Sequence, residues 1–244
     1  MFVMEGNLER RLREAGEEEL SELVQTHRDE IGISEARQIL RNPHTSGEVV
    51  EILLDTPELL TSHEVKKDLA AHPHIPQGRA LDLLPTLFWR DLVRIGADSR
   101  VRPVVRRAAD RVLASRLPGL ATGEKVAIAR TAGPGLLARL RHDPSPRVMG
   151  ALLQNSRLTE GALLPAAVSD QTPGPVLETI AEDRRWGVRY PVRVALAKNP
   201  ATPPMVALRT LPHLKKHDLR TVARGRRIPS AVRRRAKLLL GEGI

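Results

Sequence analysis

The sequence contains no cysteine, and this absence excludes several kinds of chemistry at once. A chain without thiols forms no disulfide, no thiolate metal site and no cysteine nucleophile. Aromatic residues are almost as scarce, with two Phe, two Trp and one Tyr among 244 residues. The core must therefore consist of Leu, Val, Ile and Ala, a composition that suits close packing of helices and does not favour a β-sheet.

Long apolar runs are missing too. The N-terminal stretch MFVMEGNLER becomes charged after four residues, and no later run reaches the length of a membrane span. We therefore expect a soluble, unexported chain with no membrane partner. The lack of cysteine agrees with a cytoplasmic location.

The sequence also lacks the common catalytic motifs: a serine elbow, an HExxH zinc motif and paired carboxylates among apolar residues. TGEK at Thr122–Lys125 lacks the phosphate-binding glycine pattern and predicts a helix start with Thr122 as N-cap. Five histidines are candidate metal ligands: His63, His72, His74, His213 and His217. None of them has a third ligand or a carboxylate cluster at metal-binding spacing. We expect no metal, no cofactor and no small-molecule substrate.

The sequence does contain a repeated pattern, which is clearest at Asp183–Leu211. Apolar residues at three- and four-residue spacing predict a buried helix face formed by Val188, Val192, Ala195 and Leu196. Asn199, in a left-handed conformation, and Pro200 are predicted to end this helix. Thr202 as N-cap and Pro203 at the first helical position predict a second helix, which buries Val206, Leu208 and Leu211.

Weaker copies of this pattern of helix ends and helix starts lie at Ala36–Leu54, Val65–Leu84 and Val148–Leu164. Capping boxes are predicted for two pairs, Thr45 with Glu48 and Thr61 with Glu64, and Thr159 is predicted to begin a helix. Each unit is too small to bury its apolar face alone. The pattern therefore predicts a stacked helical array.

These residues resemble the variant leucine-rich repeat, a HEAT-like helical family of bacterial proteins. The resemblance rests on the best copy: Asp183, Trp186, Val188, Arg189, Ala195, Asn199, Pro200, Thr202, Pro203 and Leu208. It implies an all-α fold, a right-handed α-solenoid of stacked short helix pairs. Some members carry an iron–sulfur cluster on N-terminal cysteines, which this chain lacks. The resemblance therefore implies an architecture more than an activity.

Two segments are predicted. Residues 1–32 form acidic capping helices, with Leu8, Leu12, Leu20, Leu23 and Val24 at helical spacing, or alternatively an autoinhibitory or partner-docking segment. Residues 33–244 form the helical array as a single elongated domain. Within it, Phe88 and Trp89 are predicted to pack in the core or between repeats.

Charge is distributed unevenly along the chain. Residues 1–70 hold 8 Lys and Arg against 16 Asp and Glu, whereas residues 184–244 hold 16 against 2. Such asymmetry indicates an anionic partner, although arginines are also common on solvated helix faces. If Val65, Val101 and Val188 are equivalent, cations recur at matching positions and form a basic row: Lys66, Arg102, Arg106, Arg189, Arg193, Arg233 and Lys237.

We therefore expect a non-catalytic binding scaffold whose basic face engages an acidic protein partner. A nucleic-acid-binding module is the first alternative. The second is a HEAT-like alkylpurine DNA glycosylase, in which Trp89 with Asp91, or Trp186 with Asp183, would take the aromatic and acidic parts. Trp89 and Trp186 are accordingly the candidate aromatic contacts.

Overall fold

The computed structural model describes the backbone of residues 2–242 and the side chains from Leu8 to Glu242. Over this range the chain forms 17 α-helices and five short 3-10 helices, with no β-strand. The predicted all-α fold is confirmed. None of the described helices is both long enough and apolar enough to span a bilayer.

The helices divide into two compact units, Met1–Ser115 and Arg116–Ile244. The boundary expected at residue 32 and the single array over 33–244 remain predictions. Two separate helices occupy the acidic N-terminal segment, and four of its five expected apolar positions are buried: Leu12, Leu20, Leu23 and Val24.

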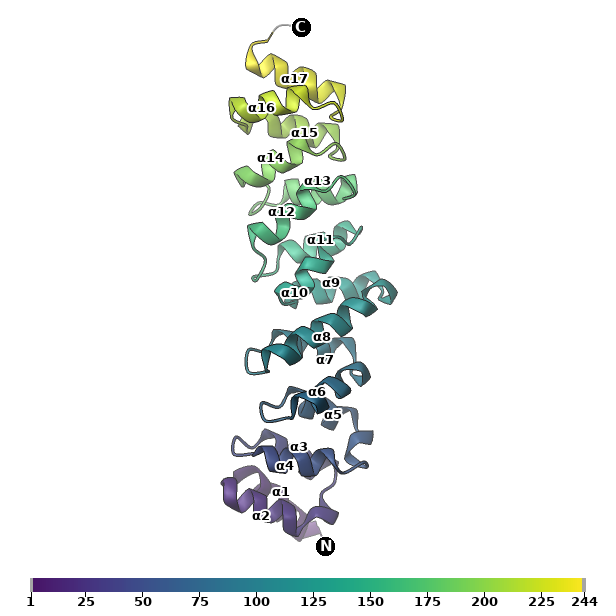
Figure 1. Cartoon of the computed structure of the whole chain (residues 1–244), viewed down its shortest axis with the longest axis vertical. Helices are drawn as coiled ribbons and strands as arrows, with labels where there is room; N and C mark the ends of the chain where they lie inside the picture. The colour runs from purple at the N-terminus through teal and green to yellow at the C-terminus, as the bar shows by residue number, and fades with distance from the viewer. Residues whose placement is uncertain (1, 243–244) are drawn as a thin grey trace. The chain divides into compact units, whose positions relative to one another are not determined.

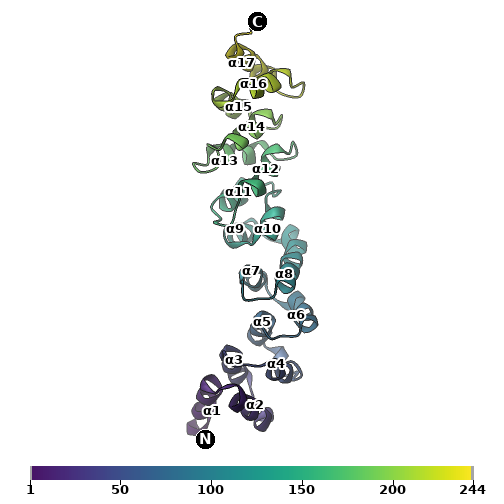
Figure 2. The same cartoon turned by 60° about the vertical axis from the view of Figure 1, so that its left-hand side comes forward.

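In the first unit, odd-numbered and even-numbered helices form two layers (Figures 1 and 2). Consecutive members of the odd layer pack on one another, namely α1 (Phe2–Glu14), α3 (Ile33–Arg41), α5 (His63–Ala71) and α7 (Trp89–Ala97). The even layer holds α2 (Glu17–Thr26), α4 (Gly47–Leu54), α6 (Gln77–Leu83) and α8 (Pro103–Arg116). Three 3-10 turns join them: Arg28–Glu30, Leu59–Thr61 and Leu84–Thr86.

The second unit has the same alternation. Its even layer is a continuous series of contacts from α10 (Pro134–Leu140) through α12 (Glu160–Val168) and α14 (Tyr190–Lys198) to α16 (Lys216–Arg224). The odd layer holds α9 (Thr122–Thr131), α11 (Pro146–Leu153), α13 (Gly174–Glu182), α15 (Pro204–Thr210) and α17 (Ser230–Leu240). The 3-10 turns are Leu117–Gly119 and Leu211–His213.

Several helices begin one residue away from the predicted N-cap. Thr159 caps α12 as predicted, and its side chain accepts a hydrogen bond from the Ala162 N–H. The predictions of Thr45, Thr61, Thr122 and Thr202 as N-caps are wrong, because the caps are Ser46, Ser62, Ala121 and Pro203. The Thr45 hydroxyl instead donates to the carbonyl of Ile39, and Thr61 donates to Glu58. A hydroxyl that bonds back to the previous turn cannot cap the next helix.

Three buried asparagines close helices by a different device from the one predicted. Asn199 has φ −84° and ψ 119°, so the predicted left-handed conformation is wrong. Its Nδ2 donates to the carbonyls of Ala167 and Ser169, both at 2.8 Å, at the end of the neighbouring α12. Asn42 and Asn155 make the same paired bonds to the ends of α1 and α9. Each asparagine therefore joins two successive helices of one layer.

The core is aliphatic, as predicted, but its register in the segment Asp183–Leu211 differs at one end. Val192, Ala195 and Leu196 are buried, whereas Val188 is 56% exposed because α14 begins only at Tyr190. In the second helix of that repeat Val206 and Leu211 are buried and Leu208 is partly buried.

His72 occupies at the end of α5 the place that asparagine takes elsewhere. It is 9% exposed, and its Nδ1 accepts the His74 N–H at 3.3 Å. Burial, with the nearby charge of His74, lowers the pKa of His72 from 6.5 to about 4. The folded-state pKa of His72 lies below its value in the unfolded chain, so protonation of His72 favours unfolding. The contribution of the neutral, buried His72 to the free energy of unfolding is therefore complete above pH 6.5 and is lost as the pH falls towards 4.

We expect His72→Asn to remove this acid sensitivity. The free energy of unfolding of the variant should exceed that of the parent by an amount that grows by about 1.4 kcal/mol per pH unit below pH 6.5. Urea unfolding between pH 4.5 and 7.5 measures the difference, with His44→Asn at an exposed position as the control. A pH-independent difference would show that His72 does not titrate in this window.

Candidate binding surface

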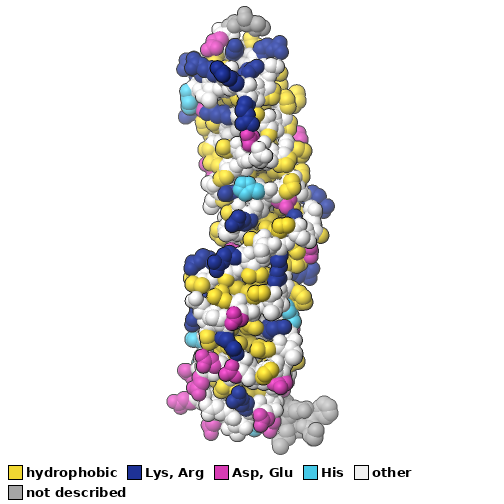
Figure 3. All heavy atoms as spheres, turned by 45° about the vertical axis from the view of Figure 1, so that its right-hand side comes forward, with side chains coloured by type: hydrophobic (Ala, Val, Ile, Leu, Met, Phe, Trp, Pro, Cys, Tyr) yellow, Lys and Arg dark blue, Asp and Glu magenta, His cyan; other side chains and the backbone are white. Residues whose placement is uncertain are grey.

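Lysines and arginines concentrate on the helix pair α16–α17, where ten cations occur between positions 215 and 237 against the single acid Asp218. These ten residues, hereafter the cationic helix pair, are Lys215, Lys216, Arg220, Arg224, Arg226, Arg227, Arg233, Arg234, Arg235 and Lys237. Figure 3 shows Lys and Arg side chains gathered at this C-terminal end. Among the described residues, only Arg227 of the ten is in an ion pair, with Asp170 at 2.6 Å. The surface therefore keeps most of its charge for a partner.

The residues of the predicted basic row lie in both layers of each unit. Lys66 is on α5, in the odd layer, whereas Arg106 is in the first turn of the even-layer helix α8 and Arg102 immediately precedes that helix. In the second unit, Arg193 belongs to the even-layer helix α14 and Arg189 is its N-cap. Arg233 and Lys237 belong to the odd-layer helix α17. Within each unit the members of the row therefore lie on helices of both layers, and their alignment into one row stays a prediction.

The predicted row assumed that Val65, Val101 and Val188 occupy equivalent positions, but the true counterparts of Val65 lie one helical turn further along the chain. The third helical position holds a buried valine in each helix: Val65, Val105, Val192 and Val232. A cation follows each one at the fourth position: Lys66, Arg106, Arg193 and Arg233. Val101 and Val188 precede their helices, so they are not the counterparts of Val65.

Several of these arginines bond to the backbone of their own unit. Arg193 Nε donates to the Gly187 carbonyl at 3.2 Å, and Arg233 Nη1 donates to the Arg226 carbonyl at 3.3 Å. Arg102 Nε likewise donates to the carbonyl of Pro73. Arg189 pairs with Glu160 at 3.3 Å. Such bonds hold the loop before a helix and use donors that a partner would otherwise engage.

The two tryptophans differ in accessibility. Trp186 is 1% exposed, and its Nε1 donates to the Leu153 carbonyl at 3.0 Å, so it is a core residue and does not present a ring to a partner. Trp89 is half-buried, and its neighbour Phe88 is 63% exposed and lies on the His63 ring at 4.0 Å. Of the two places predicted for Phe88, the core is wrong, because Phe88 is the exposed N-cap of α7. Its ring contact with His63, at the start of α5, agrees with the other prediction, packing between successive helix pairs.

The acids proposed to accompany these tryptophans are held by other groups. Asp91, which is 7% exposed, bonds His63 Nε2 at 2.8 Å. Asp183 Oδ1 accepts the backbone N–H groups of Arg185 and Trp186. Over the described residues, no group of three or more His, Asp or Glu side chains lies together as a possible metal site.

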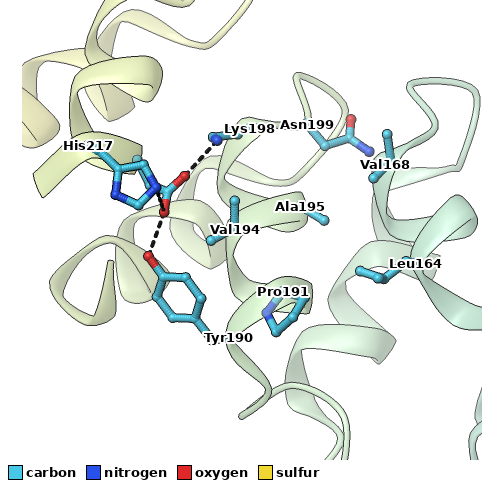
Figure 4. Close-up of a pocket in the computed structure, with 10 residues that line it drawn as sticks. Leu164, Val168, Tyr190, Pro191, Val194, Ala195, Lys198, Asn199 and His217 are labelled. Carbon is cyan, nitrogen blue, oxygen red and sulfur yellow. Dashed lines mark hydrogen bonds and ion pairs between the residues drawn. The ribbon is translucent and has the colours of Figure 1, made fainter. Parts of the chain in front are cut away.

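A groove of about 500 Å³ opens on the second unit along α12, α14 and the start of α16 (Figure 4). Most of its lining is apolar, with Leu164 and Val168 from α12 and Pro191, Val194 and Ala195 from α14. This volume falls within the range of natural ligand sites.

The polar end of the groove is a network around the buried carboxylate of Asp218 (Figure 4). Tyr190 Oη donates to Asp218 Oδ2 at 2.5 Å, Lys198 Nζ lies 2.7 Å from Oδ1, and His217 Nε2 lies 3.0 Å from Oδ2. Burial acts to raise the pKa of Asp218, but the bonds from Lys198 and Tyr190 outweigh it and hold the pKa below its usual value. Burial and the Asp218 bond raise the pKa of Tyr190. The network fixes α14 against α16.

A sequence pattern marks the contact between α14 and α16. LPTLFWRDL at 84–92 and LPHLKKHDL at 211–219 share the pattern Leu-Pro-x-Leu-x-x-x-Asp-Leu. In both, the buried aspartate bonds the residue 28 positions earlier, which is His63 for Asp91 and Tyr190 for Asp218. Each partner stands first in its helix, so the two joints are structural equivalents.

No protein-family model matches the chain, and the comparisons with curated proteins and with solved structures find no significant match.

Proposed function

We propose that the chain is a non-catalytic helical scaffold that binds an acidic protein partner through the cationic helix pair. The observation that carries the proposal is the charge of that pair. Its segment, residues 215–237, holds ten cations and a single acid, Asp218, which is buried and already bonded to Lys198. The matching pattern of packing within each unit supports stacked repeats, and we propose the α-solenoid and the variant leucine-rich repeat resemblance on this basis.

The acidic protein partner is preferred to nucleic acid because an aliphatic groove adjoins the cations. Phosphates gain nothing from apolar side chains, whereas association between proteins is driven largely by burial of apolar surface. The glycosylase alternative gains no support, since Trp186 is buried and Asp91 is bonded to His63.

Charge reversal on the cationic helix pair tests this proposal. We expect Arg220, Arg224, Arg234 and Arg235, changed together to Glu, to weaken binding of a labelled oligoglutamate peptide by about thirtyfold or more, at about 1 kcal/mol or less for each site. Fluorescence anisotropy measures the affinity, with labelled duplex DNA titrated in parallel over a salt series.

A matched variant separates location from total charge. Arg90, Arg94, Arg107 and Arg111 are exposed in the first unit, and their reversal to Glu changes net charge equally. Equal losses in both variants would contradict a site on α16–α17. Tighter binding of duplex DNA than of the acidic peptide at physiological salt would favour the nucleic-acid alternative.

A further inference from the structure

The exposed ridges of three successive helices change in chemistry across the even layer of the second unit. Positions two, five and nine of a helix share one face. On α12 they are Gly161, Leu164 and Val168, on α14 they are Pro191, Val194 and Lys198, and on α16 they are His217, Arg220 and Arg224. None of the nine is buried. The face therefore runs from apolar on α12 to cationic on α16.

The apolar part of this face is unusual for a helix surface. Val168 is 62% exposed, and it lines the groove together with Leu164, Pro191 and Val194. Figure 4 shows Leu164 and Val168 across the groove from Pro191 and Val194, with the Tyr190, Lys198 and His217 network at the far end. A contiguous apolar strip bordered by polar groups is typical of an interaction surface.

The charge beside the strip is positive and uncompensated. The only acids on α12, α14 and α16 are Glu160 and Asp218, and each is in an ion pair, with Arg189 and Lys198 respectively. The exposed Arg220 and Arg224 have no ion pair among the described residues. A partner that covers the strip would therefore be attracted by these arginines if it carried carboxylates at one end.

We propose that this face docks an acidic amphipathic segment of a protein partner. Its apolar side chains lie on Val168, Leu164 and Val194, and its carboxylates lie over Arg220 and Arg224. The inference rests on the proposed function and specifies the partner's chemistry. A purely anionic ligand would leave the apolar strip exposed to water, so the strip distinguishes this partner from a polyphosphate.

The experiment uses two labelled peptides of identical Glu and Leu composition. One places leucine along a single helical face, and the other is scrambled. A helix of about 14 residues is about 21 Å long, enough to cross three helices that lie about 8–10 Å apart. We expect the amphipathic peptide to bind the full chain at least about tenfold more tightly than the scrambled one, a difference of about 1.4 kcal/mol.

Matched variants locate the site. Val168→Gln should weaken binding of the amphipathic peptide about fivefold through lost apolar burial, whereas Met205→Gln, which changes an apolar side chain 69% exposed on α15, should leave it unchanged. Reversal of Arg220 and Arg224 to Glu should cost about tenfold, more than reversal of Arg234 and Arg235 on α17.

The results distinguish failure of the docking inference from failure of the proposed function. If both peptides bind equally and Val168→Gln has no effect, the docking inference is overturned while binding of acidic proteins by the cationic helix pair stands. If neither peptide binds and duplex DNA does, both proposals are overturned. Unfolding curves of each variant establish that the fold is retained, and the high exposure of Val168 makes this the expected result.

Discussion

Replacing Gly187 by alanine should lower the free energy of unfolding of the second unit by about 3 kcal/mol or more. A Cβ at this position would lie 2.1 Å from the carbonyl oxygen of Ala181 and 2.8 Å from its carbonyl carbon. Both are backbone atoms, so no side chain can rotate to relieve the overlap. The backbone between α13 and α14 must move instead.

That movement would affect residues on both sides of Gly187. Trp186 immediately precedes it and is buried against Leu153, and the Gly187 carbonyl accepts the Arg193 Nε bond. Tyr190, three residues later, begins α14 and bonds Asp218. We therefore expect the variant to weaken the joint between α14 and α16 as well as the local turn.

Trp186 is a convenient reporter for this measurement, because the other tryptophan, Trp89, lies in the first unit. In a Trp89→Phe background, urea unfolding followed by fluorescence reports on the second unit alone. Gly161→Ala is the control, since a Cβ there meets nothing within 4 Å on α12, and alanine should raise helix stability by up to about 1 kcal/mol. Similar losses in both variants would contradict the steric explanation.

The sequence predicted that helices form, and where they end, better than it predicted where they begin. Asn199 and Pro200 correctly predicted the end of α14, and the apolar spacing correctly identified Val192, Ala195 and Leu196 as core. The start of each helix was less certain, because a threonine hydroxyl has a competing partner in the carbonyls of the previous turn. Apolar spacing alone also placed Val188 and Val101 in a helical register that they do not occupy, because α14 begins at Tyr190 and α8 at Pro103.

The members of the predicted basic row lie on helices of different layers within each unit. Lys66 and Arg106 follow the buried valines of α5 and α8, and Arg193 and Arg233 follow those of α14 and α17. The two helices of each pair are three apart in chain order, so the alternation puts them in opposite layers. A single repeat does not show how many helices separate it from the next one.

The groove could not be predicted from any single stretch of the sequence. Its lining residues are up to 54 positions apart, from Leu164 to Asp218, and they meet only because α12, α14 and α16 are successive members of one layer. Composition did indicate the strongly basic C-terminal segment, which α16 and α17 carry. It could not indicate that an apolar strip borders it.

Asn199→Ala should destabilise the second unit by about 3 kcal/mol. The substitution removes the donors to the carbonyls of Ala167 and Ser169 and the acceptor of the Ala201 N–H, and it leaves those backbone groups without their partner in a buried corner. Each of the three lost bonds contributes about 1 kcal/mol, which together gives the expected loss. Unfolding monitored by Trp186 measures the effect.

Thr202, three residues further along the same corner, provides the matched control. It is 2% exposed, yet its hydroxyl has no hydrogen-bond partner. Thr202→Val keeps the shape and removes an unsatisfied hydroxyl, so stability should be unchanged or slightly higher. If Thr202→Val proved as harmful as Asn199→Ala, the loss in the second variant could not be assigned to the hydrogen bonds of Asn199. If only Asn199→Ala is harmful, the hydrogen bonds between α14 and α12 are what hold successive helices of this layer together.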